Sequence, residues 1–369
     1  MKSTLKWLLM IGFVTMFVFS LTAASCFGGG GKASSSAGSS GGTEAATTQA
    51  APAAAGSTRS GPTWTAVDVS SIFENRRING ITWGNNKFVA VGDDGNMAYS
   101  ADGIKWTAIE DPGFGSSNNR INNIIWGNDK FVAVGGASTT PKVAYSSDGI
   151  SWTCTTLDSS HPRTDIAWGN GTFVVVGSDQ IMYSRDGISW TKVTDTKFGG
   201  SDTIHGIAWG GGKFVALGNS DGRGLNYMAY STDGTIWTGV EPPTFKDSTT
   251  WELSGNGIAW GGNKFVAVGK MASTGHSEDG INWKAVRLDD IFGEYNAING
   301  VAWGGNRFVA VGDKDTIAFS PDGITWTKAS NTPFDGGDPT WGTKINGVAY
   351  GNNKFVAVAD NGKMAYWQP

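Results

Sequence analysis

The segment INGITWGNNKFVAVGDDGNMAYSADGIKWT, Ile78 to Thr107, decides the fold, because the chain contains seven versions of it. The Trp-Gly pair of this segment, or a Tyr-Gly variant, recurs at spacings of 43, 42, 41, 51, 43 and 47 residues. The pairs begin at Trp83, Trp126, Trp168, Trp209, Trp260, Trp303 and Tyr350. A period of this length is typical of solenoids, propellers and other repeat arrays.

Each repeat predicts four short strands, which we name A to D in chain order. In the first repeat they cover residues 81–83, 87–91, 97–100 and 104–107. Strand B is a continuous apolar run, which is typical of a strand covered on both faces. No segment after residue 60 has a sustained helical period. The repeats therefore predict an all-β domain.

The turns between strands A and B contain only Asn, Asp and Gly. These residues tolerate positive φ, which a two-residue type I′ hairpin requires at both positions. The pairs are Asn85-Asn86, Asn128-Asp129, Asn170-Gly171, Gly211-Gly212, Gly262-Asn263, Gly305-Asn306 and Asn352-Asn353.

The turns between strands C and D share the pattern Ser-x-Asp-Gly-x-x-Trp, and we call them the Asp turns. In each, the carboxylate is expected to accept backbone N–H groups of its own turn, with Gly in the left-handed conformation. The Trp is expected to pack between neighbouring sheets. The six aspartates are Asp102, Asp148, Asp186, Asp233, Asp279 and Asp322.

The two ends of the repeat region complement each other. The seventh repeat ends at Pro369 without a strand D, whereas Trp64-Thr65-Ala66-Val67 precedes the first strand A and copies a strand D. If this N-terminal strand completes the last sheet, the repeats close into a ring with only short, protected edges. We therefore predict a seven-bladed β-propeller of four-stranded antiparallel blades over residues 63–369.

The first 62 residues predict a secretion signal followed by a tether. Residues 1–25 combine early lysines, an apolar run and small residues before Cys26. This arrangement resembles a bacterial lipoprotein signal, which implies lipidation of Cys26; an ordinary cleaved signal is the alternative. Residues 26–62 are rich in Gly, Ser and Ala and predict a disordered tether. The expected location is the bacterial cell envelope, at the outer membrane or the cell surface.

Charge and cysteine content limit the functional classes. The net charge of −4 implies no general attraction to nucleic acid. Besides Cys26 there is only Cys154, which is expected to be a small strand D residue rather than a nucleophile. The histidines lack metal-ligand spacing, and no phosphate-binding or dinucleotide motif is present. We expect no metal and no cofactor.

Length variation among the repeats indicates a working face. The A–B and C–D turns have constant length, whereas the B–C and D–A loops vary. In an antiparallel blade these two pairs of connections lie on opposite faces, which we call the uniform face and the variable face. Binding residues tend to lie on variable loops over a rigid scaffold. Tolerance of insertions would produce the same pattern.

Three groups of residues on the variable face are candidate binding residues. Polar residues at the start of strand A would form a ring at the channel mouth, or would satisfy loop backbone: Asn79, Asn122, Thr164, His205, Asn256, Asn299 and Asn346. Basic residues before strand A would form a sector able to hold a carboxylate or phosphate, or would be scattered solvated charges: Arg77, Arg120, Arg163 and Lys344. Two loop tryptophans would anchor a sugar or a protein, or would pack on their own loops: Trp251 and Trp341.

The Asp turns resemble the Asp-box, or bacterial neuraminidase repeat, of sialidase-like propellers, with one residue fewer between Asp and Gly. The repeats are also similar to those of photosystem assembly-factor propellers. The sialidase resemblance implies an arginine triad, a tyrosine nucleophile with a glutamate partner and an acid-base aspartate. The family's Arg-Ile-Pro start is matched only by Arg77-Ile78-Asn79, which Arg120-Ile121-Asn122 repeats. A repeated feature favours a structural role.

We therefore predict a lipid-anchored, monomeric, non-catalytic propeller that binds a protein partner through its variable face. The alternative from another functional class is a glycan-active protein, either lectin-like or a sialidase-like glycoside hydrolase.

Overall fold

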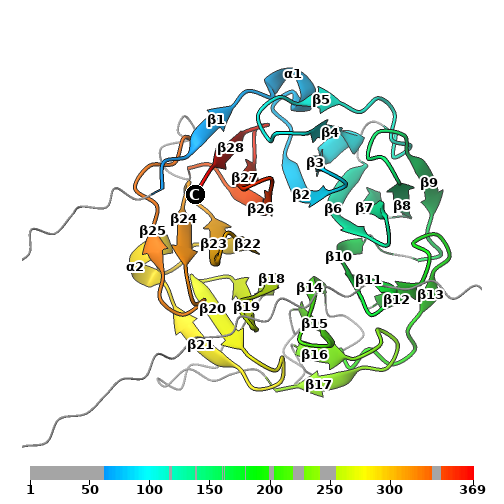
Figure 1. Ribbon diagram of the computed structural model, residues 1–369. Coiled ribbons are helices and arrows are strands. Elements are labelled where there is room, and N and C mark those ends of the chain that lie inside the picture. The colour runs from blue at the N-terminus through cyan, green and yellow to red at the C-terminus, as the bar shows by residue number, and fades with distance from the viewer. Residues whose placement is uncertain are drawn as a thin grey trace, which may run out of the picture. The chain divides into compact units, whose positions relative to one another are not determined.

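In the computed structural model, the described residues are 62–369 without 116–118, 138, 160, 162, 179, 199–202, 219–227, 242–254 and 335–341. They form seven four-stranded antiparallel sheets arranged as the blades of a ring (Figure 1). The predicted seven-bladed propeller is confirmed. The expected signal, Cys26 and tether lie outside the described residues, as do Trp251 and Trp341. No helix within the described ranges is long and apolar enough to cross a membrane.

Strands A to D follow one another from the channel outward in every blade. Blades 1 to 3 contain β2 (Ile78–Gly84), β3 (Lys87–Gly92), β4 (Met97–Ser100), β5 (Thr107–Ala108); β6 (Arg120–Gly127), β7 (Lys130–Ala137), β8 (Thr140–Ser146), β9 (Thr153–Thr156); and β10 (Arg163–Gly169), β11 (Thr172–Gly177), β12 (Gln180–Ser184), β13 (Thr191–Lys192).

The remaining blades repeat this order. Blades 4 to 7 contain β14 (Ile204–Gly210), β15 (Lys213–Gly218), β16 (Met228–Ser231), β17 (Thr238–Val240); β18 (Gly255–Gly261), β19 (Lys264–Gly269), β20 (Ser273–Ser277), β21 (Lys284–Arg287); β22 (Ile298–Gly304), β23 (Arg307–Gly312), β24 (Ile317–Ser320), β25 (Thr327–Lys328); and β26 (Ile345–Gly351), β27 (Lys354–Ala359), β28 (Met364–Trp367), β1 (Thr65–Val67).

Two predicted strand boundaries were wrong. Strand A of the first repeat begins at Ile78, three residues earlier than expected, and strand D begins only at Thr107. Trp106 is therefore the last residue of the Asp turn and not part of the strand. Short helices occur in two D–A loops, α1 (Ser70–Phe73) and α2 (Asp289–Phe292), and η1 (Asp93–Gly95) lies in a B–C loop. Each α-helix ends in a buried Phe that packs under its loop.

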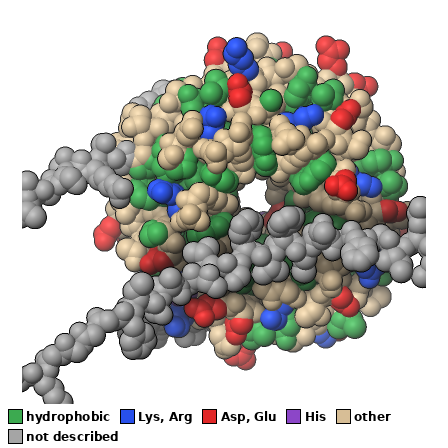
Figure 2. Space-filling model, in the orientation of Figure 1, with side chains coloured by type: hydrophobic (Ala, Val, Ile, Leu, Met, Phe, Trp, Pro, Cys, Tyr) green, Lys and Arg blue, Asp and Glu red, His purple; other side chains and the backbone are tan. Residues whose placement is uncertain are grey.

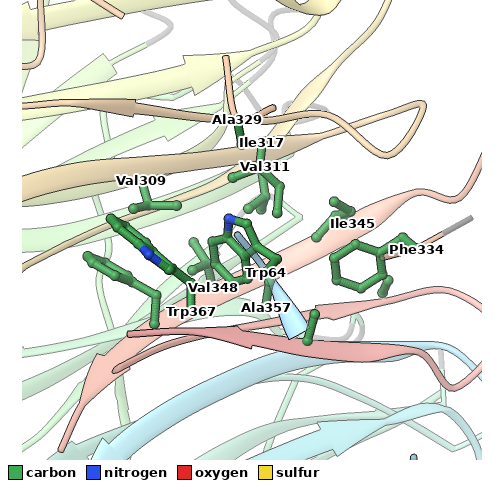
Figure 3. Packing of buried hydrophobic residues seen from close by; sticks show 13 residues of the cluster. Trp64, Val309, Val311, Ile317, Ala329, Phe334, Ile345, Val348, Ala357 and Trp367 are labelled. Atoms are coloured by element: carbon green, nitrogen blue, oxygen red, sulfur yellow. The ribbon is translucent and has the colours of Figure 1, made fainter. Parts of the chain in front are cut away.

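The ring closes as predicted. β1 pairs with β28 in antiparallel register, with Thr65 opposite Tyr366 and Val67 opposite Met364. Trp64 is only 2 % exposed and packs 6.1 Å, centroid to centroid, from Trp367 (Figure 3). The N-terminal strand thus completes blade 7 and covers the free edge of β28.

The core lies between the blades. One apolar cluster occupies each junction between neighbouring blades, and the B strands supply more of its buried side chains than any other strand. The Trp-Gly pairs sit at the same junctions: a Cβ on Gly84 would lie 2.2 Å from the ring of Trp126 in the next blade. A Cβ on Gly351 would meet Trp83 in the same way, across the closure. The pair recurs because each glycine provides space for the aromatic ring of its neighbour.

Candidate functional site

The polar ring predicted at the start of the strand A segments surrounds the central channel. Each of its seven residues falls where the register between strands A and B shifts by one residue. Asn79, for example, lies at the irregularity between Ile78 and Gly80. Such a bulge re-aims a side chain away from the normal alternation. The ring lines a cavity of about 360 Å³ in the channel, which is open at its centre (Figure 2).

The ring residues connect each blade to the next. Asn79 Nδ2 donates to the carbonyl of Ile121 at 3.0 Å, and Asn122 Nδ2 donates to that of Arg163 at 2.7 Å. The pattern continues around the channel through Thr164, Asn256, Asn299 and Asn346, the last of which donates to Ile78 and so returns to blade 1. The ring is therefore a belt of hydrogen bonds between blades.

His205 is the exception in this belt. Its Nε2 atom is buried and has no hydrogen-bond partner among the described residues. Burial lowers the pKa of the imidazole, and the nearby Lys270 lowers it further. His205 is thus neutral at neutral pH, with a polar atom at the channel that the fold does not satisfy.

Aspartates of the B–C loops hold the ring in place from the variable face. Asp93 accepts a hydrogen bond from Asn79 at 2.9 Å, and Asp360 accepts one from Asn346 at 2.9 Å. Asp313 accepts one from Asn299 at 3.0 Å. These contacts indicate that the ring asparagines have a structural role in addition to lining the mouth.

Three of the four predicted basic residues gather at the channel mouth. Arg77, Arg120 and Lys344 line a shallow cavity of about 430 Å³ together with the ring. Arg77 is ion-paired with Asp360 at 2.7 Å and Arg120 with Asp93 at 2.9 Å. Lys344 makes no ion pair with a described residue. Among the described residues, the mouth therefore combines two ion-paired arginines with a lysine that has no ion pair.

Arg163 does not belong to this sector, which corrects the sequence prediction. It is fully buried, and its guanidinium donates hydrogen bonds to the carbonyls of Gln180 in β12 and of His161 in the preceding loop. Because its donors satisfy backbone carbonyls, Arg163 stabilises blade 3 and does not contact solvent.

A groove that the sequence did not indicate adjoins the mouth. It has a volume of about 330 Å³ and lies on the variable face, between loops of blades 6 and 7. Tyr295, 79 % exposed, lies at this groove with Lys314, Asp313 and Asp360, and Lys344 lines both the groove and the mouth. Tyr295 has no counterpart in the other repeats, so comparison of the repeats gave no signal for it.

One carboxyl group lies deep in the channel. After the ring residue, strand A carries Gly in five blades, but Asn123 in blade 2 and Asp165 in blade 3. Asp165 accepts hydrogen bonds from Asn123 Nδ2 and from the N–H groups of Ile166 and Ile207. Burial raises the pKa of Asp165 to about 6, although these hydrogen bonds oppose the shift. The absence of a glycine in these two repeats was the signal that could have revealed this pair.

The Asp turns occupy the opposite, uniform face. In the first, Asp102 Oδ1 accepts from the N–H groups of Ile104 and Lys105, both at 2.8 Å, and Ser100 Oγ accepts from Gly103 at 2.8 Å. The same arrangement occurs in the other five, as predicted. These hydrogen bonds lower the pKa of Asp148 to about 2. The carboxylates of these turns are thus bonded to backbone N–H groups of the same turn.

Other candidates have no ligand-binding arrangement. Cys154 lies in β9 and is half-buried, and burial raises the pKa of its thiol. Within the described ranges, no three His, Cys, Asp or Glu side chains are close enough to hold a metal ion.

Comparisons with known proteins show the fold. The chain matches no protein-family model and no curated protein sequence. It is similar to YCF48 from Cyanidioschyzon merolae, with a TM-score of 0.59 and 18 % identity over 83 % of this chain and 99 % of that one. A structure described as YCF48 bound to D1 peptide has a TM-score of 0.60 and 15 % identity, over 84 % of this chain and 98 % of that one.

An enzyme shares the architecture. The GH74 xyloglucanase from Xanthomonas campestris has a TM-score of 0.60 and 15 % identity, covering 82 % of this chain and 53 % of that chain. At such identities the likeness defines the class of this protein as a seven-bladed β-propeller. Both a peptide-bound protein and a glycoside hydrolase occur among the similar structures, so function has to be argued from the site.

Proposed function

We propose that this propeller is a non-catalytic binding module whose partner is a protein, and that the partner contacts the variable face around the channel mouth. The observation that carries the proposal is that three basic side chains line one polar cavity. They are Arg77, Arg120 and Lys344, which lie at or just before the inner strands of blades 1, 2 and 7. Arginine and lysine at a recessed surface are suited to bind carboxylate groups. Lys344, without an ion pair among the described residues, is the cation that a partner carboxylate would meet first.

The adjoining groove extends this surface. Tyrosine is enriched at protein interfaces because its ring contributes a large contact area at low cost in conformational entropy. Tyr295 and Lys344 lie at the same groove. A partner segment with an aromatic or aliphatic side chain and a nearby carboxylate fits this combination.

A peptide complex of a similar propeller supports the proposal. The match between this chain and the solved structure described as YCF48 bound to D1 peptide covers 98 % of that chain. The fold is therefore compatible with peptide binding.

We further propose that a lipid on Cys26 anchors the protein in the bacterial cell envelope, with residues 26–62 as the tether. The basis is the sequence Ala23-Ala24-Ser25-Cys26 after an apolar run. Labelling with a radioactive fatty acid should mark the wild type and not Cys26→Ala, and the variant should leave the detergent phase. Equal labelling of both proteins would refute the anchor.

The partner-binding proposal is tested with variants matched for exposure on the two faces. Tyr295 and Ile236 are 79 % and 76 % exposed, on the variable and uniform faces respectively. Immobilised wild type, Tyr295→Ala and Lys344→Glu would be compared with the control variants Ile236→Ala and Lys105→Glu in pull-downs from envelope extracts. The partner recovered by the wild type should be lost with the first two and retained with the controls. Loss with the controls instead would move the binding surface to the uniform face.

The glycan-active alternative predicts a different result. A glycoside hydrolase of the usual kind requires two carboxyl groups on either side of the scissile bond. Among the described residues, Asp165 lies alone as a carboxyl group inside the channel, and Asp93, Asp313 and Asp360 at the mouth are bonded to the ring asparagines. A glycan array and a fluorogenic sialoside assay would decide: specific glycan binding or turnover that depends on the variable face would replace the protein-partner proposal.

A further inference from the structure

The inner strand of every blade directs a backbone N–H group into the channel. In blade 1, Gly84 and Lys87 flank a two-residue hairpin and therefore form a hydrogen-bonded pair. Because bonded and non-bonded pairs alternate along an antiparallel ladder, Ile81 and Ala90 form a non-bonded pair. The N–H of Ile81 consequently points away from β3, toward the channel.

The same register holds in all seven blades, so the channel contains a ring of seven inward N–H groups at one level. They belong to residues that line the cavity: Ile81, Ile124, Ile166, Ile207, Ile258, Val301 and Val348.

Three of these N–H groups are occupied by side chains of the protein. Ile124 donates to Asn123 Oδ1 at 2.8 Å. Asp165 receives the other two: Ile166 donates to its Oδ1 at 2.7 Å, and Ile207 of the next blade donates to its Oδ2 at 2.8 Å. A carboxylate that bridges two neighbouring blades therefore fits this ring, and the protein itself provides the example.

The other four N–H groups lie in consecutive blades, 5, 6, 7 and 1. In each of these blades the preceding residue is a glycine and supplies no acceptor: Gly257, Gly300, Gly347 and Gly80. Among the described residues, no hydrogen bond from the N–H of Ile258, Val301, Val348 or Ile81 to a protein acceptor is formed. This arc of four donors faces a cavity of about 360 Å³ whose mouth carries Arg77, Arg120 and Lys344.

We propose that the channel binds a small free carboxylate, such as a two- to six-carbon mono- or dicarboxylate, through the N–H groups of Ile258, Val301, Val348 and Ile81. The geometry repeats that of Asp165: the oxygens of one carboxylate bridge the N–H groups of two adjacent blades. The cavity volume suits a small molecule. The belt of ring side chains above this level, tied to neighbouring blades, favours a free ligand over the end of a polypeptide.

The test places a second internal carboxylate in the arc. In Gly257→Asp, the new side chain would take the N–H groups of Ile258 and Val301 as Asp165 takes those of Ile166 and Ile207. A Cβ at Gly257 lies 3.3 Å from the Asn299 carbonyl oxygen and 3.4 Å from Gly300 Cα, so the backbone of blade 6 must shift by a few tenths of an ångström to admit a side chain. Gly257→Ala is the matched control, because it adds the Cβ without the carboxylate.

The full-length chain and both variants would be titrated calorimetrically with sodium acetate, succinate and citrate, with sodium chloride at matched ionic strength as reference. At least one carboxylate should bind the wild type saturably with a Kd below about 1 mM. Gly257→Asp should weaken that binding at least about tenfold, and Gly257→Ala should change it less than about threefold. Absence of saturable binding, or equal binding by Gly257→Asp, would overturn the proposal.

A second measurement does not depend on the variants folding. In amide NMR spectra of the wild type, the carboxylate should shift the N–H resonances of Ile258, Val301, Val348 and Ile81 and leave that of Ile124 in place. Shifts confined to the mouth, around Lys344, or binding only of a peptide with a free carboxyl terminus, would refute the channel site and leave the proposed partner surface intact.

Discussion

The Asp turns and the channel ring are both repeated around the propeller, but their side chains find hydrogen-bond partners at different distances along the chain. In an Asp turn such as that of Asp148, the carboxylate and the Ser146 hydroxyl bond to groups within five residues of each other. In the ring, Asn79 and Asn346 donate to carbonyls of the next blade. The first feature stabilises a hairpin, whereas the second connects blades. We therefore expect variation in the ring, as at His205, to affect the site, and variation in an Asp turn to affect local stability.

The largest expected effect concerns the connection between blades 7 and 1. Deleting residues 1–70 removes β1 and Trp64, whereas deleting residues 1–62 leaves them. The longer deletion should lower the free energy of unfolding by more than the about 3–5 kcal/mol of a buried Trp truncation, because a sheet edge is also exposed. Denaturant unfolding and size-exclusion chromatography check this. Equal stability and equal monomer content of the two truncations would contradict the role of closure.

A smaller effect is expected at a single junction between blades. In Gly84→Ala, the new Cβ would lie 2.2 Å from the Trp126 ring, so one blade must shift. Overpacking of this kind costs about 1–3 kcal/mol. Gly347→Ala is the control, since its Cβ would make only ordinary contacts at 3.5 Å. Thermal unfolding should separate the two variants; similar melting temperatures would show that the junction adapts freely.

Within one turn, Asp148→Ala should cost about 1–3 kcal/mol, because it leaves backbone N–H groups without their acceptor. The pKa of Asp148 is lowered from 3.8 to about 2 in the folded state. Its contribution is therefore present above pH 3.8 and is lost as the pH falls toward 2. The stability difference between wild type and variant should shrink over that range, and partner binding should be unchanged. A difference that stays constant with pH would argue against the carboxylate as the stabilising group.

Asp165 should show the opposite pH dependence. Its folded pKa is raised from 3.8 to about 6, so the folded state holds the proton more tightly than the unfolded state. The stability linked to this proton is present below pH 3.8 and is lost as the pH rises through about 6. Asp165→Asn should abolish that decline, as measured by denaturant unfolding between these pH values. The same slope in wild type and variant would mean that another group titrates.

The smallest expected effect is a gain in stability at His205. In the belt, the acceptor that corresponds to His205 is the carbonyl of Gly255 in the next blade. His205→Asn should donate to it and stabilise the protein by about 0.5–1.5 kcal/mol. His205→Ala is the control and should give no such gain. A destabilised His205→Asn would indicate that blades 4 and 5 are not spaced as the other blades are.

The fold was predictable because its signals are local. The Asn85-Asn86 turn adopts positive φ at both residues, as the two-residue hairpin requires. The Asp102 turn forms its hydrogen bonds within four residues. The closure by Trp64 follows from counting strands, since seven repeats with six complete D strands leave one to be supplied. Each of these inferences needs only the chemistry of a short segment and its repetition.

The site needed the tertiary structure, because the hydrogen bonds of its belt connect residues 40 or more positions apart. The sequence grouped Arg77, Arg120, Arg163 and Lys344, yet in the sheet Arg163 takes the buried position that Ile78 has in blade 1, opposite the last residue of strand B. The missing glycine marks Asp165 as an exception among the repeats, but its raised pKa depends on burial beside the next blade. Short-range turn chemistry thus specifies what one repeat becomes. The environment of each side chain at the channel is decided by which neighbour the closed ring brings against it.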